Sequence, residues 1–513
     1  MRGKIPKEAA DVMRALAAEQ HAAYLVGGCV RDLLLGREPK DWDVATDATP
    51  EEVQRIFSRR SDATSEVGTP TGSVGGRTIY ENQFGTVGVK TDSDDPRLKV
   101  VEVTTFRLEG KYTDKRHPDE VKFAKTIEED LSRRDFTINA IAMTQDSKLV
   151  DPFRGQDDLR QNIIRTVGDP AARFNEDALR LLRAVRLAAE LSDFSTRGGP
   201  ASGWQIEGAT RDAVKEHAGL LEMIAKERIR DEFVKMVETP HAAQGVLLLE
   251  ELGLLRYVLP ELREGIGVGQ DKHHIYAVFE HSVRALDYAA KKNYSLEIRL
   301  ASLLHDAGKP RTKAGESPNS TFYNHEMVGA KMAARALDRL RFPSGVIERT
   351  VHLVRWHMFY YNVGEVSAAG VRRFLARVGP ENVDDLIKVR EADRIGSGVP
   401  KAVPYKLRHL LFMIEKVKHD PISPKMLKVN GEDVMKILGI PPGPRVGQAL
   451  DILLEEVLDD PKKNTEENLG RRIRELGKLS EKELGKAREK ARGKKEEFEQ
   501  GIEAEMKRKH YVK

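Results

Sequence analysis

Two short stretches near the N-terminus decide how the first domain is interpreted. The first reads Val26-Gly27-Gly28-Cys29-Val30-Arg31-Asp32, and the second reads Lys40-Asp41-Trp42-Asp43-Val44-Ala45-Thr46. Because alternate residues of a strand point to the same face, we expect Asp41 and Asp43 side by side, with Trp42 and Val44 facing the core. Paired carboxylates suit Mg²⁺, which binds one or two carboxylates and completes its shell with water and substrate phosphates.

The first stretch has the features of a phosphate-binding turn. Gly27 and Gly28 let the backbone approach a phosphate closely, and Arg31 adds a forked donor. Alone, each half is weak evidence, since Gly-Gly turns are common and an Asp-x-Asp at a strand end is more often a solvated turn. Both halves lie between residues 26 and 46, and together they predict a site for a nucleoside triphosphate.

The order of these residues also resembles that of a known family. Gly-Gly-x-Val-Arg-Asp, then Leu-Gly, then Asp-x-Asp resembles motif A of the class II nucleotidyltransferases, which include tRNA CCA-adding enzymes and bacterial poly(A) polymerases. The resemblance covers roughly residues 20 to 460 and departs around 68–80 and 192–203. It implies an α+β nucleotidyltransferase head, a small mixed β-sheet with helices, followed by a largely α-helical neck, body and HD domain.

The resemblance also implies how the acidic pair works. Asp41 and Asp43 would hold two Mg²⁺ ions. One ion would lower the pKa of an RNA 3′-OH, and the other would stabilise the pyrophosphate leaving group.

Composition limits the class of protein. At 513 residues the chain is too long for one ordinary core, so three or four domains are expected. Lys and Arg total 85 against 81 for Asp and Glu, a near balance that still permits a basic face for RNA. A single cysteine precludes an internal disulfide and fits a reducing compartment. We see no membrane-spanning run and no signal-peptide core, and we expect a cytoplasmic enzyme.

The periodicity of apolar residues outlines the domains. It predicts a helix over 5–20, strands at 24–26, 85–90 and 99–105, and mostly helices after residue 152. From Pro461 the chain is rich in Lys, Arg and Glu, which predicts a solvated or frayed helix. We expect a nucleotidyltransferase head over 1–150, a helical neck and body with the base template and RNA-binding region over 151–265, an HD phosphohydrolase-like domain over 266–400, a C-terminal helical region over 401–460, and a charged helical tail over 461–513.

Glu102 is a candidate third acidic group. In the stretch Val101 to Arg107, alternation places Val101 and Val103 inward and Glu102 on the opposite face. If this strand lies beside the Asp41/Asp43 strand, Glu102 joins the acidic pair. An ordinary exposed glutamate on an edge strand fits the pattern equally well, and the family resemblance favours the functional interpretation.

A second motif lies at residues 129–140. It reads Glu129-Asp130-Leu131-Ser132-Arg133-Arg134-Asp135-Phe136-Thr137-Ile138-Asn139-Ala140. Taken alone, Asp135 could be a helix N-cap that accepts from backbone amides. The string resembles motif B of the family, in which Arg and Asp hold the triphosphate and the sugar 2′-OH. The resemblance assigns these roles to Arg134 and Asp135, supported by Asn139.

The third motif is the stretch Arg173 to Arg186. Its apolar residues follow the i, i+3, i+4, i+7 spacing of a helix, with Asp177, Arg180 and Arg183 on the other side. A salt-bridged surface helix would show the same pattern. Glu-Asp-x-x-Arg resembles motif D, which implies that Asp177 and Arg180 read the base of CTP or ATP and that Arg183 and Arg186 lie near phosphates. The stretch 226–233 resembles motif E, with a structural role.

The stretch 110–118 bears on the product. It resembles the loop that switches the family's pocket from C to A addition, and it carries Lys115 and Arg116. Enzymes that add only CC are thought to lack this basic part, so we favour full CCA or A addition. A mobile surface loop would have the same composition.

A second metal site is expected in the C-terminal half. Imidazoles and carboxylates together suit a transition-metal or mixed Mg²⁺/Mn²⁺ site, although a lone histidine is more often structural. The order His…His-Asp…His…His…Asp resembles the HD phosphohydrolase domain. It implies that Mn²⁺, Ni²⁺ or Mg²⁺ is bound by His281, His305, Asp306 and Asp393. His325 and His357 could extend the site or bind phosphate.

The sequence therefore predicts an enzyme that adds CCA, or its terminal A, to tRNA 3′ ends without a template. Its expected partners are the tRNA acceptor end, CTP and ATP, with no membrane, in a monomer or homodimer. A poly(A) polymerase shares motifs A and B and differs in product length. A metal phosphohydrolase centred on His305 and Asp306 and a non-catalytic RNA-binding protein are two rival functions.

Overall fold

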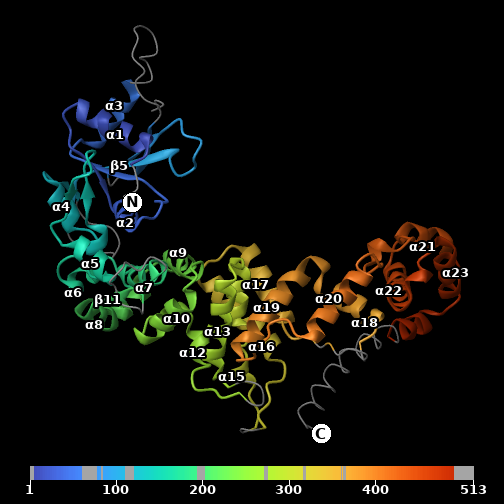
Figure 1. Cartoon of the computed structure of the whole chain (residues 1–513). Coiled ribbons are helices and arrows are strands. Elements are labelled where there is room, and N and C mark those ends of the chain that lie inside the picture. The colour runs from blue at the N-terminus through green and yellow to red at the C-terminus, as the bar shows by residue number, and fades with distance from the viewer. Residues whose placement is uncertain are drawn as a thin grey trace. The chain divides into compact units, whose positions relative to one another are not determined.

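The computed structural model describes residues 5–59, 78–82, 85–109, 121–192, 203–270, 275–315, 319–359, 361 and 366–489 (Figure 1). It divides into two compact units, Met1–Pro260 with Arg339–Phe342, and Glu261–Asp338 with Pro343–Lys513. Within the described ranges, no helix is long and apolar enough to cross a membrane. The loop expected at 110–118 and most of the departures at 68–80 and 192–203 lie outside these ranges.

The head is built on a mixed seven-stranded sheet in the order β3-β4-β5-β2-β1-β8-β9. Its strands are β1 (Ala23–Val26), β2 (Asp43–Thr46), β3 (Thr78–Asn82), β4 (Thr86–Lys90), β5 (Val100–Thr105), β8 (Ala142–Met143) and β9 (Leu149–Val150). β2 and β5 pair in parallel, while β1 pairs antiparallel with both β2 and β8. The strands expected at 24–26, 85–90 and 99–105 are confirmed.

The parallel pair β2–β5 positions the acidic residues. Asp43 is the register partner of Glu102, so the expected neighbourhood of the two strands is confirmed. Val101 and Val103 are fully buried while Glu102 is exposed, as the alternation predicts. β2 begins only at Asp43, and Asp41 lies in the bend before it.

Helices of the head cover and connect these strands. They are α1 (Lys7–Ala18), α2 (Gly28–Leu35), α3 (Pro50–Arg59) and α4 (Ile127–Ser132), with a short 3₁₀ helix at Thr137–Asn139. α2 follows β1 directly through Gly27, whose φ of +78° disfavours residues with a side chain. A capping box formed by Thr126 and Glu129 starts α4.

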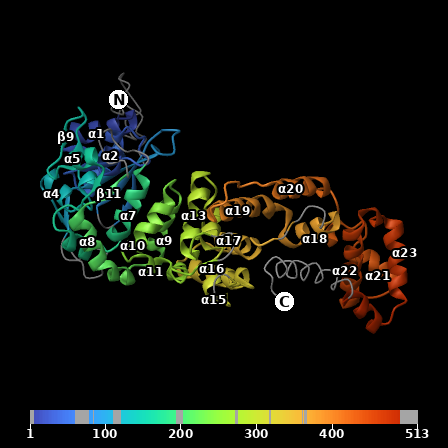
Figure 2. The same ribbon diagram turned by 60° about the horizontal axis from the view of Figure 1, so that its bottom comes forward.

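The remainder of the first unit is mainly helical, as expected (Figure 2). Its helices are α5 (Gly155–Gln161), α6 (Pro170–Glu176), α7 (Arg180–Glu190), α8 (Gly208–His217), α9 (Lys226–Val237), α10 (Ala242–Glu251) and α11 (Leu255–Val258). Two short strands, β10 (Ile163–Ile164) and β11 (Gln205–Ile206), pair in parallel. Earlier in the chain, β6 (Arg107–Glu109) and β7 (Val121–Phe123) form a separate antiparallel pair. The apolar side of α7 is buried and packs against α9 and α10.

One expectation about this region is wrong. The sequence predicts Asp177 on the same helix as Arg180, whereas α6 ends at Glu176 and α7 begins at Arg180. Asp177 has extended backbone angles, φ −134° and ψ 103°, and its Oδ1 accepts from the Leu179 backbone N–H at 3.1 Å. An aspartate that caps the following turn competes with the helix for its own backbone.

The second unit begins with a bundle of helices. These are α12 (Pro260–Arg263), α13 (Val278–Lys291), α14 (Leu296–Leu304), α15 (Lys309–Thr312), α16 (His325–Arg339), α17 (Ser344–Trp356) and α19 (Val383–Gly396). The last position of the His-Asp-Ala-Gly string, Gly308, must be a glycine, because a Cβ there would lie 2.1 Å from the His325 carbonyl oxygen. The turn after α14 therefore packs directly against the start of α16.

The C-terminal helices complete the second unit. They are α18 (Ala368–Val378), α20 (Tyr405–Val417), α21 (Gly431–Leu438), α22 (Pro444–Asp459) and α23 (Glu466–Gly477). The expectation of a solvated or frayed helix from Pro461 is wrong for the described residues, since Leu469, Ile473, Leu476 and Leu484 are buried in a cluster with residues of α21 and α22. The i, i+4, i+7 spacing of the first three is a narrow apolar stripe among charged residues, which overall composition conceals.

Ile473→Ala tests the packing of this segment. Because Ile473 is fully buried, its truncation should lower the free energy of unfolding by about 2–5 kcal/mol. Arg471→Ala, an exposed change on the same helix, should alter it by less than about 0.5 kcal/mol. Denaturant unfolding of the full chain measures both, and equal stabilities for the two variants would contradict the packed arrangement.

Candidate functional site

Acidic groups gather at the start of β2. Asp43 lies beside Glu102 through the strand pairing, and Asp41 precedes it in an exposed bend. Burial raises the pKa of Asp43 to about 6, against the lowering effect of Arg134, and the charge of Asp41 adds to the rise. A carboxylate that is difficult to ionise beside other carboxylates is stabilised by a bound cation, so this donor set fits Mg²⁺.

Gly27 is where the basic and acidic groups meet. A Cβ at Gly27 would lie 2.9 Å from Nη1 of Arg134 and 3.6 Å from Oδ2 of Asp43. At Gly28, the first residue of α2, a Cβ would be 3.6 Å from Nη2 of Arg31, an ordinary contact. The expected close approach of backbone to the site therefore depends on Gly27 more than on Gly28.

Arg134 is held by the buried Asp130. Nη2 of Arg134 donates to Oδ2 of Asp130 at 3.2 Å, while Arg133 donates to Oδ1 of the same carboxylate at 2.8 Å. The sequence pattern does not single out Asp130, and only its burial and its two arginine donors identify it. The Arg134 guanidinium stays close enough to Asp43 to lower the pKa of that residue.

A buried hydrogen-bond chain joins the three motifs. Nη1 of Arg31 donates to Oδ1 of Asn139 at 2.8 Å, and Nδ2 of Asn139 donates to Oδ1 of Asp135 at 3.0 Å. Nε of Arg183 donates to Oδ2 of Asp135 at 2.8 Å. Residues of α2, the 3₁₀ helix and α7 are thereby linked through side chains alone.

Asp135 is the centre of this chain. Besides Asn139 and Arg183 it accepts from the Phe136 backbone N–H at 2.8 Å, a bond of the kind that the N-cap interpretation predicts. Its burial opposes ionisation, but Arg183, the Asn139 amide and Arg180 outweigh burial and hold the pKa of Asp135 well below its usual range. With both oxygens engaged, Asp135 anchors Arg183, and its expected contact with a ribose 2′-OH stays a prediction.

Asp177 and Arg180, the predicted base readers, both form hydrogen bonds with other groups of the chain. Nη1 and Nη2 of Arg228, a residue of α9, donate to Oδ1 and Oδ2 of Asp177 at 3.3 and 3.0 Å. Arg180 donates to Oε2 of Glu176 at 2.6 Å and to the Arg133 carbonyl at 2.9 Å. The sequence does not predict the pairing of Arg228, although the stretch 226–233 that contains it resembles motif E.

Arg186 forms a separate ion-pair cluster. It donates to Oε2 of Glu232 at 2.6 Å and also to Glu190. The bond to Glu232 holds α7 against α9. The expected position of Arg186 near phosphates stays a prediction, while Arg183 joins the network around Asp135.

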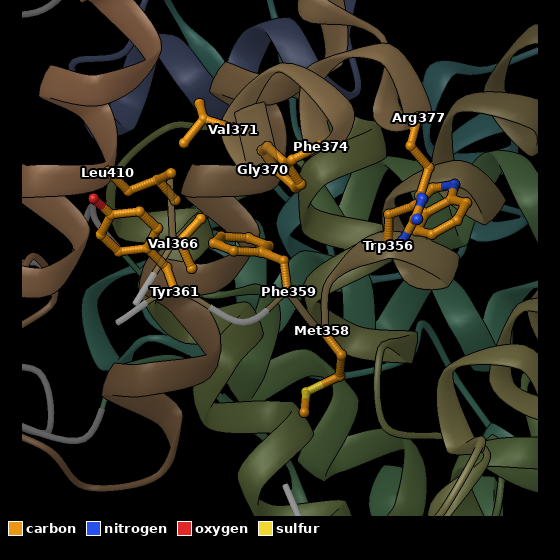
Figure 3. Close-up of a pocket in the computed structure, with 10 residues that line it drawn as sticks. All are labelled: Trp356, Met358, Phe359, Tyr361, Val366, Gly370, Val371, Phe374, Arg377 and Leu410. Atoms are coloured by element: carbon orange, nitrogen blue, oxygen red, sulfur yellow. The ribbon is translucent and has the colours of Figure 1, made fainter. Parts of the chain in front are cut away.

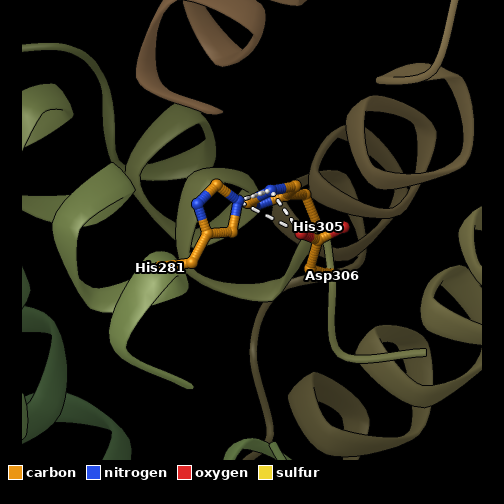
Figure 4. Close-up of side chains that lie close together, drawn as sticks. All are labelled: His281, His305 and Asp306. Carbon is orange, nitrogen blue, oxygen red and sulfur yellow. Dashed lines mark hydrogen bonds and ion pairs between the residues drawn. The ribbon is translucent and has the colours of Figure 1, made fainter. Parts of the chain in front are cut away.

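The second unit brings the predicted HD residues together, and Figure 4 shows His281, His305 and Asp306 among them. Nε2 of His281 lies 2.9 Å from Nε2 of His305, 3.1 Å from Oδ2 of Asp306 and 3.3 Å from Oδ1 of Asp393. They come from α13, the end of α14 and α19. Imidazole nitrogens and carboxylate oxygens converging at these distances form a donor set that fits a divalent metal.

The other oxygen of Asp306 faces a further pair of histidines. Oδ1 of Asp306 lies 3.3 Å from Nε2 of His325 and 3.8 Å from Nε2 of His357, and these three residues form a second possible metal-binding group. Lys309 contacts Oδ2 at 2.6 Å. Of the two roles that the sequence leaves open for His325 and His357, this geometry favours an extension of the metal site, because both histidines face a carboxylate that the first group shares.

The acidic and basic side chains of this cluster shift one another's pKa. Burial would lower the pKa of His305, but Asp306 and Asp393 raise it to about 10. Burial opposes ionisation of Asp306 as well, yet His305 and Lys309 hold the pKa of Asp306 well below its usual range. A metal ion bound by His305 would therefore replace a proton there.

An apolar pocket lies in the same unit (Figure 3). It is lined by Trp356, Met358, Phe359, Tyr361, Val366, Gly370, Val371, Phe374, Arg377 and Leu410. Arg390 connects the pocket with the His–Asp cluster, since its Nη1 donates to Asp393 at 2.7 Å and lies 3.8 Å from the Met358 sulfur. The described lining offers neither carboxylate nor imidazole, so the pocket itself supplies no acid–base group of that kind.

Gly27→Ala tests the turn before α2. The added Cβ is strained at φ +78° and meets Arg134, so the affinity for the expected ligand Mg·CTP should fall by about 5- to 150-fold, equivalent to the roughly 1–3 kcal/mol of such strain. Gly28→Ala, with ordinary contacts, should change the affinity less than about threefold. Titration calorimetry measures both, and equal affinities would contradict the role of Gly27.

Family models match along most of the chain. They are the poly A polymerase head domain over residues 23–165, the probable RNA and SrmB-binding site of polymerase A over 203–266, the HD domain over 278–396, and tRNA nucleotidyltransferase domain 2 over 408–472. The expected head and HD domain are thus both matched by family models, and the fold class expected from the sequence is confirmed.

Relatives with long alignments support the same assignment. The chain is 38% identical to the A-adding tRNA nucleotidyltransferase of Deinococcus radiodurans, over 66% of this chain and 76% of that protein. It is 33% identical to the CCA-adding enzyme of Geobacillus sp. (strain WCH70), over 90% and 95%. The crystal structure of the Bacillus stearothermophilus CCA-adding enzyme with CTP superposes with a TM-score of 0.65 at 30% identity, over 91% and 96%. This chain therefore belongs to the tRNA nucleotidyltransferase family of CCA-adding and A-adding enzymes.

Proposed function

We propose that this enzyme adds CCA, or its terminal A, to the 3′ end of tRNA, with CTP and ATP as substrates. The observation that carries the proposal is the pairing of Asp43 with Glu102 next to Asp41, close to the Arg134 guanidinium. Acidic groups for metal ions and a guanidinium for phosphate are what nucleotidyl transfer needs at one place.

The acidic residues would hold two Mg²⁺ ions, with Asp41 and Asp43 as ligands and Glu102 beside them. Bound there, Mg²⁺ supplies charge neutralisation and a lowered pKa for the attacking 3′-OH. Arg134, which Asp130 holds in place, would bind the triphosphate. Arg31 and Asn139 would keep the turn at Gly27 in position through their hydrogen bond.

Selection of C and A would fall to the region between α6 and α7. Asp177 offers an acceptor and Arg180 a donor to the edge of the incoming base. A rigid polar pair rejects a base that leaves its groups unpaired, which gives selection without a nucleic-acid template. Arg183, anchored by Asp135, would complete the binding of the nucleotide.

The chain's relatives include both A-adding and CCA-adding enzymes, so the product is decided by experiment. We favour full CCA or A addition because Lys115 and Arg116 are present in the stretch that resembles the switching loop. A poly(A) polymerase is the rival function for the same site. The proposed partners are tRNA, CTP and ATP, with a monomer or homodimer in the cytoplasm.

Incorporation into tRNA transcripts tests the proposal. Transcripts ending before CCA, after C and after CC receive CTP, ATP or both with Mg²⁺. Stepwise addition of C, C and A that then stops is expected, and Asp43→Asn should lower the rate by at least about 10³-fold because a metal ligand is lost. His305→Asn, in the other unit, should leave the rate unchanged.

The remaining outcomes separate the rival functions. Addition of A alone to the CC-ending transcript identifies an A-adding enzyme. A long A tail identifies a poly(A) polymerase. No incorporation on any transcript by the unmodified enzyme would contradict nucleotidyl transfer.

We also propose a metal-dependent phosphohydrolase activity in the second unit. The observation that favours it is the Asp306 carboxylate, which faces His281 and His305 with one oxygen and His325 and His357 with the other. A carboxylate with imidazoles on both sides would hold divalent ions, and such ions, when bound, supply an activated water and stabilise a phosphate leaving group. Mn²⁺, Ni²⁺ or Mg²⁺ would be held by these residues together with Asp393, and Lys309 would lie near the phosphate.

Metal titration tests this second site. Because the pKa of His305 is about 10 and a metal ligand must be a neutral imidazole, Mn²⁺ binding at pH 8 should release about one proton. The Mn²⁺ affinity should therefore rise with pH, by up to about tenfold per unit. Calorimetry in buffers of different ionisation enthalpy measures the release.

The matched variants act on one site each. Asp306→Asn should abolish Mn²⁺-dependent hydrolysis of p-nitrophenyl phosphate, while Asp43→Asn should retain it. An Mn²⁺ affinity that is independent of pH, or hydrolysis that survives in Asp306→Asn, would overturn the assignment of the site.

A further inference from the structure

We propose that Glu190, the last residue of α7, is a positioning residue for Asp41: it holds the loop of residues 36–42 so that the Asp41 carboxylate lies beside that of Asp43. The inference rests on the proposed function of the first unit, in which these two carboxylates bind Mg²⁺. Glu190 lies outside the motif residues expected to touch the nucleotide, and it acts on Asp41 through the loop alone.

Asp41 needs support from the rest of its loop. It lies in an exposed bend between the end of α2 at Leu35 and the start of β2 at Asp43, so neither a helix nor a strand fixes its backbone. Within the described part of the chain, no hydrogen bond or ion pair holds its side chain. Because a metal-binding side chain must stay within about 0.5 Å of its working position, the loop itself has to be fixed.

The two ends of the loop are fixed by the backbone and by packing. Trp42, the residue after Asp41, is buried with 6% of its surface exposed. At the other end, Gly36 ends α2 with a left-handed φ of +73°, and the backbone N–H of Arg37 donates to the Asp32 carbonyl at 2.8 Å. Residues 37–40 have no regular structure between these points, so side chains must determine their position.

Glu190 pairs with both basic residues of this loop. Its Oε1 lies 3.5 Å from Nη2 of Arg37 and 3.7 Å from Nζ of Lys40. The pair with Arg37 is largely buried, with 10% and 14% of the two side chains exposed, whereas the Lys40 side chain is 74% exposed. The buried pair provides most of the restraint, because an exposed pair contributes little alone. Lys40 extends the restraint to the residue directly before Asp41.

The other oxygen of Glu190 is held on α7 itself. Oε2 accepts from Nη1 of Arg186, one turn earlier on the same helix, and Nε of Arg186 donates to Glu232 of α9 at 2.6 Å. Arg183, also on α7, donates to the buried Asp135 at 2.8 Å. The Glu190 carboxylate therefore extends from a helix that is fixed independently of the loop.

Removal of this one negative charge would leave several cations without compensation. Burial opposes ionisation of Glu190, yet four cations hold the pKa of its carboxyl below its usual range; they are Arg186, Arg31, Lys40 and Arg37. Without the carboxylate these cations repel one another, and Arg37 and Lys40 lie on a segment without regular structure. The loop that carries Asp41 is therefore the part that moves.

Hydrogen exchange of the full chain tests the restraint in the absence of metal and nucleotide. In Glu190→Gln the amides of residues 36–42 should exchange at least about fivefold faster than in the unmodified enzyme, because the ion pairs that hold the loop are lost. The matched control is Glu38→Gln, which removes a carboxylate of the same loop that is 74% exposed and pairs with Arg97. This control should change the exchange by less than about twofold.

The Mg²⁺ dependence of CTP incorporation tests the consequence for the site. In Glu190→Gln the half-saturating Mg²⁺ concentration should rise at least about fivefold, while the rate at saturating Mg²⁺ stays within about twofold, because excess metal ion draws Asp41 back into place. Glu190→Asp, which keeps the charge on a shorter side chain, should recover part of the change. Lys40→Gln should raise the half-saturating concentration alone but add nothing in the Glu190→Gln background, since its partner is already lost.

The outcomes separate this inference from the proposed function. If the unmodified enzyme incorporates no nucleotide, the proposed function fails, whereas hydrogen exchange still measures the restraint on residues 36–42. If the enzyme is active and folded Glu190→Gln keeps either the unmodified exchange or the unmodified half-saturating Mg²⁺ concentration, the inference is overturned. Equal shifts in Glu38→Gln would also overturn it, because any change of loop charge would then be sufficient. If Glu190→Gln does not fold, the exposed change Lys40→Gln replaces it in the comparison with Glu38→Gln, and the same two results apply.

Discussion

The buried carboxylate of Asp135 is the interaction on which the nucleotide site depends. It is bound by the Asn139 amide and the Arg183 guanidinium, and Asn139 in turn accepts from Arg31. Removing an ion from water is costly unless each lone pair is satisfied, and here the partners come from separate elements of the first unit. Satisfying one charge therefore brings α2, the 3₁₀ helix and α7 into a single arrangement.

That arrangement shows what the sequence can and cannot predict. The alternation around Val101 and Val103 predicts which side Glu102 takes, and the Gly27 turn and the strand at Asp43 follow from local rules. The pairing of Asp177 with Arg228 spans 51 residues, and no periodic pattern in the sequence indicates which charged side chains pair at that separation. Local patterns predict faces, whereas partner choice among buried charges depends on the tertiary fold.

The two wrong expectations have the same origin in competing local signals. Asp177 has helical neighbours, but its side chain caps the next turn and interrupts the helix. Around Ile473, abundant charge favoured solvent exposure, although a stripe of three or four apolar residues is enough to join a core. In the HD region the sequence predicts histidines and aspartates as metal ligands, and only the fold shows that Asp306 faces two pairs of histidines.

The two acidic sites differ in how they compensate charge, and this difference determines how each responds to a cation. In the first unit, burial and Asp41 raise the pKa of Asp43 against the nearby Arg134 guanidinium, so an incoming divalent ion relieves unfavourable charge. In the second, His305 and Lys309 already neutralise Asp306, so an ion must displace a proton from His305. If both sites bind divalent ions as proposed, the first should do so without proton release once Asp43 is ionised above about pH 6, whereas the second should exchange a proton for the metal up to about pH 10.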